Sequence, residues 1–175
     1  GWSPRCPEPP RVTELEPDQT EAVKLTIKPE NGPVPIAGIG FRTVPQAHPD
    51  TLALNMLMQI LGGGESSRMY LDLVRRKEIA EVALAAHVSF EQAGLAISAG
   101  VLMNPFGDTE AVIDALWEQI ELVQAEGVTE DELEKVRSQI YRANVTESLT
   151  IASKANALGE AAVILGDTQL ANTYL

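Results

Sequence analysis

The sequence is poor in the residues that build disulfides and metal centres. Its 175 residues include one cysteine, Cys6, and two histidines, His48 and His87. A single cysteine excludes an intramolecular disulfide and a cysteine-rich zinc site. Neither H-x-x-E-H nor H-E-x-x-H occurs, so the usual helical zinc motifs are absent as well. We therefore expect no metal ligands, no cofactor and no catalytic residue in this chain.

Long apolar runs and clusters of positive charge are also scarce. No run approaches the roughly 20 apolar residues that span a bilayer, and the first ten residues, GWSPRCPEPP, lack the apolar core of a signal peptide. Lys and Arg number 13 against 25 Asp and Glu, giving a net charge of −12. Nucleic-acid binding normally needs a basic stripe. We expect no membrane span and no nucleic-acid partner, and the cytoplasm and the periplasm stay open as compartments.

What the sequence does have is enough apolar residues, 45%, for a packed core. Residues 1–20 hold five prolines, which favours an extended linker over regular structure. Residues 21–175 then read as one domain. Because the chain does not begin with Met, we expect it to be a fragment of a longer protein.

Alternating patterns predict four strands. EAVKLTIKP, residues 21–29, alternates apolar and polar residues and is followed by a turn. VPIAGIGFRTV, residues 34–44, places Ala37, Ile39 and Phe41 on one face and two glycines on the other. EVALAAHVSF and GLAISAGV, joined by EQAG, predict an antiparallel pair.

Helical patterns fill the intervals between these strands. HPDTLALNMLMQIL predicts a buried helix that Gly62, Gly63 and Gly64 stop, with Ser66 or Ser67 as the cap of the next helix. A third helix should run from Asp108 or Thr109 to Gly127, and a capping box over residues 129–132 should start a fourth. IASKANALGEAAVILG predicts a fifth. The expected core residues on these helices are Leu54, Leu57, Met58, Leu61, Leu116, Ile120, Leu133, Val136 and Ile140. The predicted order is ββααββααα, an α+β fold with an antiparallel sheet and helices on one face.

The stretch LGGGESSRMY poses the main functional question. It lacks the Gly-Lys-Ser/Thr ending of a phosphate-binding loop, and Ser67 has no partner histidine at a spacing that supports nucleophilic catalysis. The glycines either let two elements pack closely through positive φ or let the loop backbone contact a substrate. The first interpretation is favoured, and the second stays open.

Three separated stretches resemble one family of proteins. LALNMLMQILGGGESSRMYLDLVRRKEIA, GLAISAGVLMNP and LVQAEGVTEDELEKVRSQI, in this order, look like the pitrilysin/insulinase zinc metallopeptidases. The mitochondrial processing peptidase and the core proteins of the respiratory bc1 complex are relatives. The match runs from about residue 21 to the end, and the linker before it is similar too.

The resemblance implies a role for this chain and a short list of site residues. Family members pair homologous α+β domains, and zinc is bound by an H-x-x-E-H helix in another domain. This chain resembles the domain that follows, which has no metal ligands of its own. The weak substrate-binding candidates that the resemblance implies are Gly62, Gly63, Gly64, Ser66 and Arg75. A Tyr that often accompanies the Arg is replaced here, where Glu81 or Val82 stands.

Two functions follow from the resemblance. The first is a non-catalytic structural and substrate-chamber domain of a zinc endopeptidase, inert alone, with neighbouring peptidase domains and a peptide substrate as partners and zinc in the adjoining domain. The second is a retired family member that acts as an assembly scaffold, as the bc1 core proteins do. The peptide substrate and the oligomeric arrangement are not predicted by the sequence.

Overall fold

The computed structural model describes residues 19–27, 34–104, 106–147 and 150–172. The elements are the strands β1 (Ile36–Thr43), β2 (Val82–Ser89) and β3 (Gly94–Val101), the α-helices α1 (Thr51–Gly62), α2 (Thr109–Glu126), α3 (Glu130–Glu147) and α4 (Ile151–Glu160), the π-type helices η1 (Tyr70–Arg76) and η2 (Ala161–Leu165), and the 3-10 helix η3 (Thr168–Asn172). The predicted linker lies outside the described residues, apart from residues 19 and 20, and so does Cys6. The α+β class is confirmed.

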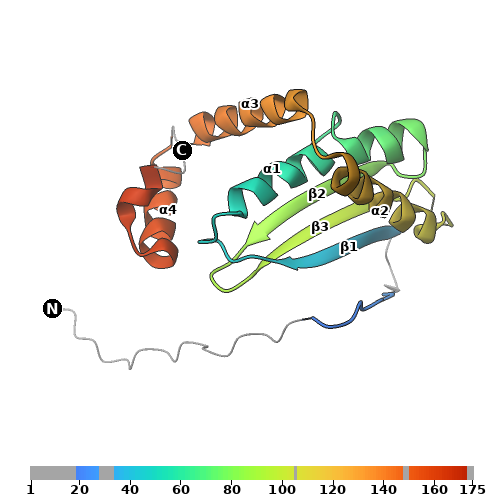
Figure 1. Cartoon of the computed structure of the whole chain (residues 1–175), viewed down its shortest axis with the longest axis horizontal. Coiled ribbons are helices and arrows are strands. Elements are labelled where there is room, and N and C mark those ends of the chain that lie inside the picture. Colours follow the sequence, from blue (N-terminus) through green and yellow to red (C-terminus); the bar gives the residue numbers. More distant parts are fainter. Residues whose placement is uncertain (1–18, 28–33, 105, 148–149, 173–175) are drawn as a thin grey trace.

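The described strands form an antiparallel sheet in the order β1-β3-β2. Helix α1 packs on β2, and α2 packs on β1 and β3. Figure 1 shows these helices on the same side of the sheet, with α3 beyond them. The expectation of helices on one face is therefore confirmed.

The first predicted strand is wrong over the residues that the structure describes. Residues 21–27 form no strand, and Val23, Leu25 and Ile27 are 74–80% exposed. The segment instead crosses near the outer edge of β1, where Lys24 forms an ion pair with Glu110 of α2. Alternation alone does not make a strand, because a strand also needs a hydrogen-bonding neighbour for its backbone. The observed order therefore begins βααββ rather than ββααββ.

The two faces of the sheet carry side chains of different size. The face under the helices has small residues, which are buried: Ala37, Ala83, Ala85, Ala96 and Ser98. Small side chains let the helices approach closely, and Gly62 at the end of α1 lies directly against the backbone of β2. On β2 and β3 the larger apolar residues point to the opposite face, whereas on β1 Ile39 and Phe41 lie on the helix-covered face with Ala37.

The core lies between the sheet and α1, η1 and α2. Its largest members with less than 2% exposure include Ile60, Met69, Leu73, Leu116 and Leu102. Of the predicted core residues, Met58, Leu61, Leu116 and Val136 are buried, whereas Leu54, Leu57, Ile120, Leu133 and Ile140 are only half-buried. Helix α1 is thus buried mainly in its second half, and its first turn exposes Leu52.

The predicted helix boundaries are largely confirmed. The carboxylate of Asp108 accepts hydrogen bonds from the backbone N–H groups of Glu110 (2.9 Å) and Ala111 (3.3 Å), and Gly127, at φ 76°, follows the last turn of α2. Thr129 and Glu132 form the expected capping box. The Ser66/Ser67 cap is wrong in detail. The Ser67 hydroxyl donates to the carbonyl oxygen of Gly64 (2.6 Å), and no side-chain oxygen accepts a capping hydrogen bond from the N–H groups at the start of η1.

Candidate functional site

The loop between α1 and η1 has a separate structural requirement at each of its three glycines. A Cβ on Gly62 would lie 1.9 Å from the backbone nitrogen of Ala85, and one on Gly63 would lie 2.0 Å from the side-chain oxygen of Gln59. Gly64 has open space around it but a φ of 95°, a conformation that L side chains rarely adopt. Close packing and backbone conformation therefore account for all three glycines.

Helix α3 holds this loop through side-chain hydrogen bonds, which we call the clamp. The guanidinium of Arg68 donates to both carboxylate oxygens of Glu132, at 2.6 and 2.7 Å, and also to the carbonyl oxygen of Gly127 at 3.1 Å. The ammonium of Lys135 donates to the carbonyl oxygen of Ser66 at 2.8 Å. The candidate Ser66 is thus held by α3 at one end of the loop. The packing of Gly62 on β2 holds the other end.

The electrostatics of the clamp favour the charged forms of both partners. The hydrogen bond from Arg68, together with bonds from Thr129, lowers the pKa of Glu132 to about 2 against the opposing effect of burial. The same hydrogen bond raises the pKa of Arg68. A bidentate guanidinium–carboxylate pair of this kind is charge-assisted and geometrically specific.

Arg75 reaches toward the same loop from η1. Its side chain is 65% exposed and lies 3.8 Å from the carboxylate of Glu65, while its guanidinium carbon is 5.7 Å from the centroid of the Tyr70 ring. The structure therefore brings the sequence-predicted residues Gly62–Gly64, Ser66 and Arg75 to one edge of the molecule. Glu81 and Val82, where the resemblance would place a Tyr, stand at the start of β2.

A buried carboxylate lies on the other side of η1. Asp72 is 5% exposed, with Lys77 at 2.9 Å and Arg76 also in contact. Burial disfavours the charged form of Lys77, but hydrogen bonds to Glu118 of α2 and to Asp72 outweigh it and raise its pKa. This cluster ties η1 to α2 and gives Asp72 the counter-charges that burial demands.

Both histidines are engaged by neighbouring groups. His87 lies between two partners, with Nδ1 2.7 Å from the Asn55 side-chain oxygen and Nε2 2.8 Å from the Thr43 hydroxyl. Burial lowers the pKa of His87, which favours the neutral ring. His48 accepts a hydrogen bond at Nδ1 from the backbone of Asp50. Over the described ranges, no group of three or more His, Cys, Asp or Glu side chains is placed to hold a metal ion.

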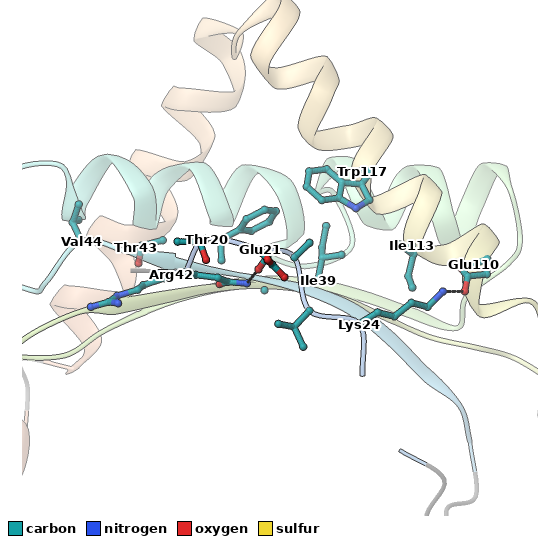
Figure 2. A pocket seen from close by; sticks show the side chains of 15 residues that line it. Thr20, Glu21, Lys24, Ile39, Arg42, Thr43, Val44, Glu110, Ile113 and Trp117 are labelled. Atoms are coloured by element: carbon teal, nitrogen blue, oxygen red, sulfur yellow. Dashed lines mark hydrogen bonds and ion pairs between the residues drawn. The ribbon is translucent and has the colours of Figure 1, made fainter. Parts of the chain in front are cut away.

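A cavity of about 940 Å³ lies at the opposite edge of the sheet. Figure 2 shows it bounded by residues 19–24, by β1 and by α2, with Trp117 above and the Lys24–Glu110 ion pair at one end. The Trp117 ring meets the Phe41 ring edge-on, with centroids 5.4 Å apart. Nothing in the sequence pattern indicated this cavity. The glycine loop packs against β2, so the two features lie at different edges.

The antiparallel sheet with helices on one face is the architecture of a known class of α+β domain. A family model described as the Peptidase M16 inactive domain matches residues 1–140. The chain belongs to this family. In the part of the chain that the structure describes, no helix is both long and apolar enough to cross a membrane.

Relatives and solved structures agree with this assignment. The chain is 27% identical over 157 residues to the protein named "Uncharacterized zinc protease YmxG" of Bacillus subtilis (strain 168). The matched region covers 89% of this chain and 37% of that protein. The inactive peptidase domain of a Bordetella parapertussis zinc-protease structure superposes with a TM-score of 0.73 at 23% identity, covering 86% of this chain and 80% of that one. A chain of complex III2 from Candida albicans shares the fold, with a TM-score of 0.64 at 14% identity over 82% of this chain and 37% of that one. This chain therefore spans little more than a third of the Bacillus protein.

Proposed function

We propose that this chain serves as the structural and substrate-chamber domain of a zinc-dependent endopeptidase whose metal lies in an adjoining domain. The observation that carries the proposal is the match of residues 1–140 to the inactive domain of the M16 peptidases. The Bacillus subtilis relative is named a zinc protease, which supports zinc chemistry in the longer protein to which this chain would belong. This chain would form part of the surface of the substrate chamber and would contact the neighbouring domain.

Within that role, the loop residues divide by their surroundings. Gly62 and Gly63 serve packing, since any side chain there would collide with β2 or α1. Gly64, Ser66 and Arg75 are the residues proposed to meet a peptide. Gly64 has nothing within 4 Å of its Cβ position, and the exposed guanidinium of Arg75 can donate hydrogen bonds to a peptide carbonyl. Substrate contact at this loop remains the second interpretation of its glycines.

Metal analysis of the purified chain tests the role directly. We expect no stoichiometric zinc and no cleavage of a mixture of unstructured peptides, because both histidines already have hydrogen-bonding partners within the fold. One tightly held zinc per chain, lost in His48→Ala or His87→Ala, would contradict the proposal.

The scaffold function is the alternative, and the fold of a chain in complex III2 shows that this architecture occurs in an assembly subunit. The two functions differ in the companion domain. A companion with an intact H-x-x-E-H helix supports the peptidase role, and a companion without it supports the scaffold.

A further inference from the structure

The cavity beside Trp117 lies between two runs of consecutive residues. Residues 19–24, which form no helix or strand, line it on one side, and residues 39–44, at the end of β1, line it on the other. Ile113 and Trp117 of α2 also line it (Figure 2). We call this space, of about 940 Å³, the edge cavity. Because each wall is a continuous stretch of chain, the edge cavity is elongated along β1, as the space left by a missing strand would be.

The β1 wall directs backbone groups toward the edge cavity. In the described sheet β1 is an edge strand that pairs with β3 alone. The Leu102 N–H donates to the Pro35 carbonyl oxygen at 3.0 Å, and in an antiparallel ladder every second residue pairs in this way. The N–H and C=O of Gly40, an odd number of residues further along, therefore point away from β3. Within the described residues, no backbone hydrogen bond joins residues 19–24 to β1.

The helix-covered side of the edge cavity is apolar and incompletely filled. Ile39 and Phe41 of β1 pack toward the core beneath α2, whereas Trp117 is still 40% exposed beside them. The neighbouring apolar residues Val23 and Leu25 are 80% and 76% exposed, so they do not fill the space. A large apolar side chain that entered here would pack on the Phe41 and Trp117 rings.

These two features together specify the chemistry of a ligand. Outward-pointing backbone groups on an edge strand pair with another extended backbone, and the side chains of a strand alternate between its two faces. A strand beside β1 would therefore place every second side chain against the apolar wall and the others away from it. The matching ligand is an extended peptide with a large apolar residue at every second position.

The wall opposite β1 is held in a way that permits entry. Lys24 and Glu110 form an ion pair at one end of the edge cavity (Figure 2), and their side chains are 71% and 58% exposed. Exposed ion pairs of this kind are weak. Residues 19–24 can therefore separate from α2 without disturbing the core.

We propose that the edge cavity binds an extended segment of the peptide substrate as an added strand on β1. Main-chain hydrogen bonds to Gly40 give affinity, and the Phe41–Trp117 wall selects large apolar side chains at alternate positions. The inference rests on the proposed function, because it takes the peptide to be the substrate of the longer protein. It adds a binding site at the edge of the sheet opposite the glycine loop.

Fluorescence anisotropy of a labelled peptide with the full chain tests the proposal. The probe is an uncharged peptide in which Phe or Val alternates with Ser or Thr, and we expect saturable binding. Two further peptides carry N-methyl groups on one or the other alternate set of amides. Only one set faces β1, so one of these peptides should bind with a Kd at least about tenfold higher, and the other should bind nearly as the probe does.

A matched pair of variants locates the site on β1. Gly40→Pro removes the outward N–H while sparing the ladder to β3, since an edge strand tolerates Pro at such a position, and should raise the Kd at least about tenfold. Gly40→Ala keeps the N–H, and its Cβ would approach no atom closer than 3.9 Å, so it should bind as wild type. Trp117→Ala should also weaken binding, because it removes part of the apolar wall. Thermal unfolding of each variant verifies that it is folded.

Two results would overturn the proposal. One is a wild-type chain that binds the probe no more tightly than a peptide of the same composition with its apolar residues adjacent. The other is probe binding that Gly40→Pro and both N-methylated peptides leave unchanged. Binding needs no zinc, so its failure contradicts the edge-cavity site alone, whereas failure of hydrolysis with a zinc-bearing domain contradicts the proposed function.

Discussion

At the residue scale, the glycine loop combines two kinds of constraint that alanine substitution separates. In Gly62→Ala the new methyl group would meet the backbone of Ala85 and Leu84 at 1.9 and 2.5 Å, so α1 must move off β2. In Gly64→Ala the methyl group meets nothing, and only the positive φ opposes it. The first cost depends on packing and the second on backbone conformation.

We predict that Gly62→Ala lowers the free energy of unfolding by about 3 kcal/mol or more, the upper range for overpacked sites. Gly64→Ala should cost about 1–2 kcal/mol. Denaturant titrations of both variants check the order, with Gly40→Ala as a control that should change little because its Cβ has room. Equal losses in Gly62→Ala and Gly40→Ala would contradict the close packing of α1 on β2.

The Arg68–Glu132 pair gives a pH-dependent prediction at the same scale. The pKa of Glu132 is about 2 in the folded chain against an ordinary value of 4.5. Because the folded pKa is the lower one, the pair stabilises the fold fully above about pH 4.5 and loses that contribution as the pH falls toward 2. Glu132→Gln keeps a capping-box residue but removes the charge.

We therefore expect Glu132→Gln to cost about 1.5–3 kcal/mol at pH 7, and the difference from wild type should shrink steadily below pH 4.5. Unfolding free energies measured from pH 7 to pH 2 test this. Glu130→Gln is the matched control, since Glu130 is 79% exposed and 3.5 Å from Arg137. A pH-independent difference for Glu132→Gln would show that the charged pair is not what holds the loop.

At the element scale, the sequence predicted the helices better than the sheet. Caps such as Asp108 and the Thr129–Glu132 box act within one turn, so local residues determine them. The strand predicted at residues 21–29 is wrong over the described residues 21–27, because pairing depends on the edge of β1, which the local pattern does not contain. Alternation located β2 and β3 correctly, but the face with the larger residues is the one without helices. A Cβ on Gly62 of α1 would collide with β2, and a Cβ on Gly100 of β3 would collide with Val112 of α2. This close packing requires small residues on the core face.

The candidate loop was visible in the sequence, whereas its clamp was not. Arg68 and Glu132 are 64 residues apart and meet only because α3 returns over the loop. The cavity beside Trp117 has the same origin, since residues 19–24, β1 and α2 converge there from distant parts of the chain. Contacts of this range depend on tertiary packing, which no local pattern encodes.

The different size requirements of the two faces lead to an element-scale prediction. Ala85→Leu should cost about 1–3 kcal/mol or more, because Ala85 is 7% exposed and lies against the end of α1. Val82→Thr, on the same strand but 42% exposed, should cost less than about 1 kcal/mol. Thermal unfolding at low protein concentration compares the two, and the reverse order would mean that the faces are assigned the wrong way round.

At the scale of the whole molecule, the two faces of the sheet differ in what covers them. Helices η1, α1 and α2 pack on one side of the sheet, and no described helix covers the opposite face. This distribution suits a domain of the inactive M16 family that works beside a catalytic domain.

The most direct test of this account is reconstitution of peptide hydrolysis from separate domains. A zinc-bearing M16 domain from the same source is held at fixed concentration, and kcat/KM on an unstructured peptide is measured as this chain is added. We predict no hydrolysis by this chain alone and a saturable rise in kcat/KM on mixing, abolished by a zinc chelator. Hydrolysis by this chain alone, or a kcat/KM that does not change at any ratio of the two domains, would contradict the account.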